Sequence, residues 1–145
     1  MSLQDWLRNG WLTRHQTSRE EITDLLAVAD RDLADCRAAG LSADWRLAIA
    51  YNAALQAATA GLAVAGFRAA RESHHYYVIQ SLAYTVQANP DLIAEFDGFR
   101  KKRNLAAYER SGATSDQEAE EMIELAETLR RRIAKWIRSE RPGLL

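Results

Sequence analysis

The fold is decided by the stretch from Leu47 to Phe67, which reads LAIAYNAALQAATAGLAVAGF. It carries no charged residue over a length that could span a bilayer. Much of it is alanine, which drives membrane insertion more weakly than Leu, Ile or Phe, and it contains Asn52, Gln56 and Thr59. We therefore expect no membrane span, but a helix buried on most sides at the centre of a small protein. Its alanines and glycines let neighbouring backbones approach closely.

The segments around this stretch have the patterns of amphipathic helices joined by short connections. Strand patterns are nearly absent, and the two prolines, Pro90 and Pro142, fall at expected element boundaries. Short connections place successive helices antiparallel. The sequence therefore predicts an all-α fold, an up-and-down bundle of four to five helices.

Start and stop signals give the expected helix boundaries. Ser18 with Glu21, and Ser115 with Glu118, have the spacing of capping boxes. Asn89 before Pro90 is typical of a helix start. The expected helices cover about 18–40, 42–66, 70–88, 90–112 and 115–139.

The N-terminal residues are expected to form an arm. Leu3, Trp6, Leu7 and Trp11 make a loosely helical pattern within 1–16, which we expect to dock on the body. Residues 17–141 are then a single helical-bundle domain, in keeping with a chain of 145 residues.

Composition excludes several classes of function. The net charge of −1 argues against a general nucleic-acid-coating protein, so any anion site must be local. Cys36 is the one cysteine, which rules out an intramolecular disulfide or a multi-cysteine zinc cluster. No glycine-rich phosphate loop, nucleophile elbow or Glu-x-x-His motif occurs, so no metal and no cofactor are expected. The N-terminus lacks a secretory signal pattern, and we expect a cytoplasmic protein.

The expected helix that starts at Pro90 carries an anomaly at Arg103. On a helical wheel, Arg103 falls within the apolar arc of Leu92, Phe96 and Phe99. A guanidinium in that place is costly to desolvate unless it is paired or opens onto a wet cleft. Two interpretations stay open here: a buried ion pair, to Asp97 or to a carboxylate of another helix, or a cation held in a pocket or at a subunit interface.

The other polar residues of this helix fall around Arg103. Arg100 lies on one shoulder of the apolar arc, and Asn104 and Tyr108 line one flank. Lys101 and Lys102 point away, which predicts an ordinary solvated surface for both.

The series Arg103-Asn104-Leu105-Ala106-Ala107-Tyr108 resembles the signature of the HEPN superfamily, small all-helical domains found in many prokaryotic defence and toxin–antitoxin systems. That signature is an Arg, usually followed by Asn, Asp or His, then three variable residues and a His. The small-residue helix that ends in Gly66 and the segment Ser73-His74-His75 are similar to further family features, so that the resemblance covers about residues 42–138. In active members the Arg and His of two protomers meet at a dimer interface and cleave RNA without metal. The resemblance thus implies a homodimer.

Tyr108 stands where the family signature has a histidine. Imidazole titrates near neutrality, whereas a tyrosine with a pKa of about 10 is a poor base but a good stacking and hydrogen-bonding group. We therefore expect a non-catalytic or weakly catalytic HEPN-like module that binds RNA or a nucleotide, or regulates a partner such as a nucleotidyltransferase or an antitoxin-type protein. Arg103 would grip phosphate, Asn104 would orient it, and Tyr108 would stack or hydrogen-bond.

Two alternatives remain, so whether the protein is an enzyme stays open. One is a metal-independent ribonuclease in which Tyr108 or a histidine of the expected helix 70–88 takes the catalytic role. His74 and His75 diverge by about 100° on a helix, so they are either half-buried structural residues or one of them faces Arg103. With Arg100 they are the candidate ligand-binding residues. The other alternative is a structural or interaction bundle in which Arg103 forms an internal ion pair.

Overall fold

The computed structural model describes residues 1–71, 74–108 and 112–145, and over 105–108 it describes the helical backbone alone. Side chains 105–107 of the HEPN-like motif, the side chain of Tyr108, and Ser73 therefore lie outside the described residues.

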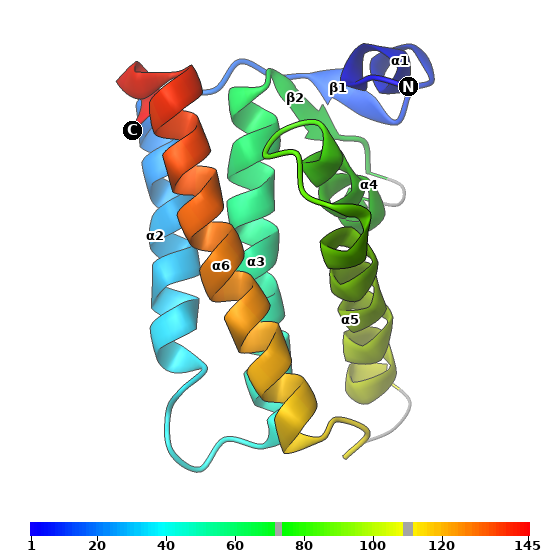
Figure 1. The fold of residues 1–145 in the computed structure, drawn as a ribbon, viewed down its shortest axis with the longest axis vertical. Coiled ribbons are helices and arrows are strands. Elements are labelled where there is room, and N and C mark those ends of the chain that lie inside the picture. Colours follow the sequence, from blue (N-terminus) through cyan, green and yellow to red (C-terminus); the bar gives the residue numbers. More distant parts are fainter. Residues whose placement is uncertain (72–73, 109–111) are drawn as a thin grey trace.

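Four long helices form the body of the protein. They are α2 (Arg19–Asp35), α3 (Ala43–Val64), α5 (Pro90–Tyr108) and α6 (Asp116–Glu140). In Figure 1, α2 and α5 run downward while α3 and α6 run upward, and both chain termini lie at the upper end. This arrangement confirms the all-α, up-and-down bundle that the sequence predicts.

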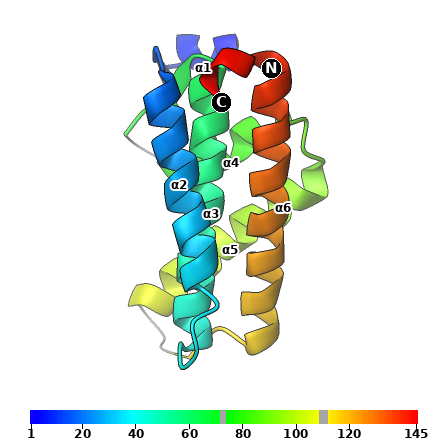
Figure 2. The same ribbon diagram turned by 90° about the vertical axis from the view of Figure 1, so that its left-hand side faces the viewer.

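Helix α3 lies at the centre of the bundle. Figure 2 shows it between α2 and α6, with α4 and α5 behind. It is long and apolar enough to cross a membrane, but 72% of its most apolar window is buried inside the protein, as in the core helix of a soluble protein. A Cβ atom added at Gly61 would lie only 2.7 Å from Cδ1 of Ile133, which is itself fully buried. The absence of a side chain at Gly61 is thus what lets α6 come this close to α3.

Helix capping agrees with the sequence in one case and departs from it in another. The hydroxyl of Ser115 accepts from the amide of Glu118, whose carboxylate accepts from the amide of Ser115, so the expected capping box is present. Ser18 likewise caps α2 by accepting from the Glu21 amide. The Glu21 carboxylate, however, bonds the side chains of His15 and Thr17, so it does not complete the expected box.

The N-terminal arm contains the short helix α1 (Leu3–Arg8) and the strand β1 (Leu12–Arg14). β1 pairs antiparallel with β2 (Phe67–Ala69), with Thr13 opposite Arg68. Trp6 is buried against the bundle, which fixes the arm in place. The sequence does not predict this ribbon, because strands of three residues are too short to show an alternating pattern.

The expected helix 70–88 is shorter than predicted. It is divided into α4 (His74–Gln80) and the 3₁₀ turn η1 (Ser81–Ala83), and a second 3₁₀ turn, η2 (Pro142–Leu144), ends the chain. The Ser81 hydroxyl donates to the carbonyl of Val78, and the following loop places Gln87 at a φ of 54°. A serine hydroxyl that bonds a carbonyl of the preceding turn competes with the helical hydrogen bonds. A residue with a positive φ, here Gln87, lies outside the right-handed helical region, so the helix cannot continue to residue 88.

Gly61 offers a direct test of the helix packing. We expect Gly98→Ala, on an open face of α5, to raise the free energy of unfolding by about 0.5–1 kcal/mol through helix propensity. Gly61→Ala gains the same propensity but crowds Ile133 in a closed core, which costs about 1–3 kcal/mol. Urea denaturation of both variants should therefore show Gly61→Ala less stable than Gly98→Ala by about 1–3 kcal/mol. Equal stability would mean that this contact does not limit the approach of α6.

Candidate functional site

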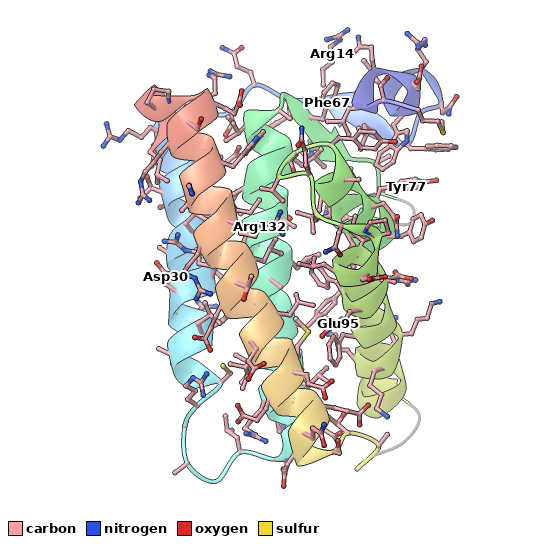
Figure 3. The ribbon with its side chains drawn as sticks, viewed as in Figure 1. Arg14, Asp30, Phe67, Tyr77, Glu95 and Arg132 are labelled. Atoms are coloured by element: carbon pink, nitrogen blue, oxygen red, sulfur yellow. The ribbon has the colours of Figure 1, made fainter. Side chains whose placement is uncertain are left out.

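Helices α4 and α5 meet at an open pocket with a volume of about 570 Å³. We call it the α4–α5 pocket. Four of its six lining residues are consecutive on α4, and Tyr77, labelled in Figure 3, marks this side. The lining residues are His74, His75, Tyr76, Tyr77, Arg100 and Asn104. The structure thus brings together four of the six site residues that the sequence predicts, from two segments of the chain.

Arg100 is the arginine that opens onto this pocket. Its Nε donates to Oδ1 of Asp97 at 2.7 Å, and its Cζ lies 5.8 Å from the ring centroid of Tyr76. Lys101 also reaches Asp97, with Nζ 3.7 Å from Oδ2. Asp97 therefore pairs with Arg100 and Lys101, and the Asp97–Arg103 ion pair considered from the sequence is wrong.

Arg103 lies behind the pocket lining, against an aromatic ring of α3. Its Cζ is 5.3 Å from the ring centroid of Tyr51, and its side chain is half-buried. Among the side chains that the structure describes, no carboxylate oxygen lies within 4.0 Å of this guanidinium. The face of an aromatic ring attracts a cation, so Tyr51 supplies a favourable contact where one of the two interpretations of the sequence has a carboxylate.

The same tyrosine contacts a histidine. Its hydroxyl is 3.1 Å from Nδ1 of His75, which belongs to α4. Burial, and then the charges of His74, Arg103 and Arg100, lower the pKa of His75 below its ordinary value of 6.5. Burial in turn raises the pKa of Tyr51. At neutral pH the site therefore contains a neutral imidazole and a neutral phenol beside two permanent cations.

His74 lies next to this group and has an environment of its own. Its ring centroid is 5.7 Å from that of His75, with the rings at 66°. Burial and the charge of Arg68 lower its pKa. In the described part of the chain no three His, Cys, Asp or Glu side chains converge as metal ligands. The two histidines are thus an uncharged pair at neutral pH on the α4 wall of the pocket.

The remaining predicted residues differ in what the structure says of them. Asn104 is exposed and lines the pocket, whereas the role of Tyr108 stays a prediction because its side chain lies outside the described residues. Lys101 is solvated, with 71% of its side chain exposed. Lys102 is not simply solvated, since its Nζ lies 3.3 Å from the Glu118 carboxylate and ties α5 to the start of α6.

Sequence reasoning missed three residues of the site, namely Tyr51, Tyr76 and Tyr77, the last of which also lines the pocket. Tyr51 contacts both Arg103 and His75, and Tyr76 lies under Arg100 with 40% of its surface exposed. The sequence could have singled out Tyr51, because it is the one aromatic residue between Leu47 and Val64 in the expected central helix. No feature of the sequence marks Tyr76 as a site residue, because a tyrosine on a short helix is ordinarily a packing residue.

The charges around His75 predict its titration. In an NMR titration, His75 should titrate below 6.5, and Arg103→Gln should move its pKa upward because one neighbouring cation is removed. Lys101→Gln, which removes an exposed cation of the same helix, is the matched control and should leave the pKa nearly unchanged. As the pH falls through 6.5, His75 is protonated in the unfolded chain before it is protonated in the folded protein. The free energy of unfolding should therefore decrease as the pH falls below 6.5. A pKa of His75 that is the same in wild type and Arg103→Gln would contradict the proximity of the two side chains.

Comparisons with known proteins add no relative to these observations. No protein-family model, no curated protein and no solved structure matches the chain. The resemblance to the HEPN superfamily therefore remains a prediction from the residues of 42–138, and the function must be argued from the geometry of the α4–α5 pocket.

Proposed function

We propose that the protein is a helical module that binds single-stranded RNA or a nucleotide at the α4–α5 pocket, with weak or no catalytic activity. The observation that carries the proposal is the position of Arg100 above the ring of Tyr76, at the edge of an open pocket. A cation binds phosphate, and an exposed aromatic ring stacks on a base, so the two together fit a nucleotide unit.

Each residue of the pocket has a separate role in this proposal. Arg100 contacts phosphate directly, because it lines the pocket. Asn104 hydrogen-bonds phosphate, ribose or a base edge, and Tyr76 stacks on the base. Arg103, which lies against the ring of Tyr51 and outside the pocket lining, adds positive electrostatic potential to the pocket. This assigns to Arg100 the direct phosphate contact that the sequence assigned to Arg103.

Local charge explains how a slightly acidic protein could hold a polyanion. The chain has a net charge of −1, but the pocket wall carries Arg100 and two neutral histidines, and no carboxylate is among the lining residues that the structure describes. Binding of this kind depends on a few phosphate contacts, so it should be modest in strength and weaken as salt increases.

Fluorescence anisotropy with a labelled single-stranded RNA of about ten nucleotides tests the proposal. Arg100→Gln should weaken binding about tenfold and lower the slope of log affinity against log salt by about 0.7. Tyr76→Leu should cost about 1–3 kcal/mol with little change in that slope, because it removes stacking and keeps the charge. Adenosine monophosphate as a competitor separates a nucleotide site from a site that needs a longer strand.

Lys135→Gln is the matched control for charge. Lys135 is exposed on α6, outside the pocket lining, so its removal should leave the affinity nearly unchanged. Equal weakening by Lys135→Gln and Arg100→Gln would mean that RNA binds through the general surface, which would refute the assigned site.

A ribonuclease is the second candidate, favoured by the position of His75. This imidazole lines the pocket, contacts Tyr51, and shares that ring with Arg103. A neutral imidazole can accept the proton of an RNA 2′-hydroxyl while that oxygen attacks the phosphorus and the bond from phosphorus to the 5′-oxygen breaks, which gives a 2′,3′-cyclic phosphate and a 5′-hydroxyl that takes its proton from water. Nearby guanidinium groups stabilise the added negative charge. In this candidate a histidine of α4 takes the place of the histidine that the HEPN signature has at position 108.

RNA cleavage in EDTA tests the second candidate. His75→Gln should reduce the rate at least about 100-fold, and a 2′-deoxy substrate should not be cut. His15→Gln is the control, because His15 does not line the pocket. If RNA binds but stays intact, the ribonuclease candidate is excluded and the binding proposal stands.

The partner proposals follow from the resemblance and concern the same face. A homodimer through α5 would bring two α4–α5 pockets together, and a nucleotidyltransferase or antitoxin-type protein could regulate access to them in the cytoplasm. Light scattering of the samples used for RNA titration measures the oligomeric state. A monomer at all concentrations would remove the homodimer from the proposal and leave the pocket unaffected.

A further inference from the structure

A second cavity lies at the end of the bundle where the β ribbon crosses, near Phe67 in Figure 3. We call it the ribbon cavity. Its volume is about 170 Å³, and it lies between the first turns of α2, the last turns of α3, β2 and α4. The apolar part of its wall includes Leu25, Leu62, Phe67 and Val78. Apolar cavities of about 150 Å³ bind molecules of the size of benzene, so a branched aliphatic side chain fits here.

An anion lies at this cavity. Oε1 of Glu21 accepts from the Thr17 hydroxyl at 2.6 Å and lies 2.7 Å from Nε2 of His15. These two hydrogen bonds, together with the charges of His15 and Arg68, hold the pKa of Glu21 below its ordinary value. Both described contacts use the same carboxylate oxygen, which leaves Oε2 able to accept from a ligand.

A cation lies at the same cavity. Arg68, from β2, is exposed and is among the lining residues. Arg68 thus lines the same cavity as Glu21 and His74, and its charge contributes to lowering the pKa of both. Arg68 and Glu21 nevertheless form no direct ion pair, because their charged atoms are more than 4.0 Å apart. An anion and a cation thus line the same cavity without forming an ion pair with each other.

We propose that the ribbon cavity binds a free α-amino acid with a small apolar side chain, such as leucine. The ammonium group would contact the Glu21 carboxylate, the carboxylate would contact the Arg68 guanidinium, and the side chain would fill the apolar part of the cavity. An amino-acid zwitterion pairs with the Glu21 carboxylate and the Arg68 guanidinium at once. A simple carboxylic acid or amine pairs with only one of the two and leaves the other facing a like charge or an apolar group. This site is separate from the proposed RNA site, and neither proposal depends on the other.

Calorimetric titration of the full chain with L-leucine tests the proposal, together with NMR spectra of the Leu62 and Val78 methyl groups. We expect saturable binding and shifts confined to the cavity methyls. 4-Methylpentanoate, isoamylamine and glycine each lack one of the three recognised groups, and each should bind at least about tenfold more weakly. No saturable binding up to about 10 mM, or equal binding of 4-methylpentanoate and leucine, would overturn the proposal.

Charge-removing variants complete the test. Arg68→Gln and Glu21→Gln should each weaken leucine binding at least about tenfold, and glutamine at position 21 can keep the hydrogen bonds to Thr17 and His15. Arg14→Gln, on the neighbouring strand β1, removes an exposed cation outside the cavity lining and should bind leucine like the wild type. Arg68 is exposed, so its variant should fold even if the Glu21 variant does not. Leucine binding by Arg68→Gln as tight as that of the wild type would refute the site.

Discussion

The close contact between α3 and α6 at Gly61 is the constraint on which the rest of the structure depends. Much of α3 carries buried residues of its own that are no larger than alanine, so the neighbouring helices approach its backbone directly. Close packing of this kind leaves little space for a large side chain. Those that α3 does carry therefore determine where the surrounding helices can lie. Tyr51 is the largest fully buried side chain among the residues that the structure describes.

The position of Tyr51 explains why the candidate site forms between α4 and α5. Its ring packs edge-on against Phe96 of α5 at 5.5 Å, its hydroxyl contacts His75 of α4, and its face holds Arg103. One side chain of the central helix thus contacts both walls of the site. A charged group that would be costly to bury among apolar residues is kept half-buried by an aromatic face, and it contributes positive potential without needing a carboxylate.

Much of the fold is predictable from the sequence, but only part of the site is. The alanine-rich stretch, Ser115 with Glu118, and Asn89-Pro90 predict the bundle because each signal acts locally. The pairing of β1 with β2 and the contact of Arg103 with Tyr51 join segments that are far apart in the chain, and no local pattern encodes them. A helical wheel shows that Arg103 faces inward, but it cannot distinguish a carboxylate partner from an aromatic ring.

The two cavities are linked through α4. His74 lines both the α4–α5 pocket and the ribbon cavity, and His75 beside it contacts Tyr51. α4 is only seven residues long, and its first residue, His74, is the one described residue that lines both cavities. Burial, and then the charge of Arg68, lower the pKa of His74; burial, and then the charges of His74, Arg103 and Arg100, lower the pKa of His75. Two adjacent histidines of this short helix therefore lie in different electrostatic environments, and α4 is the structural element that the two cavities share.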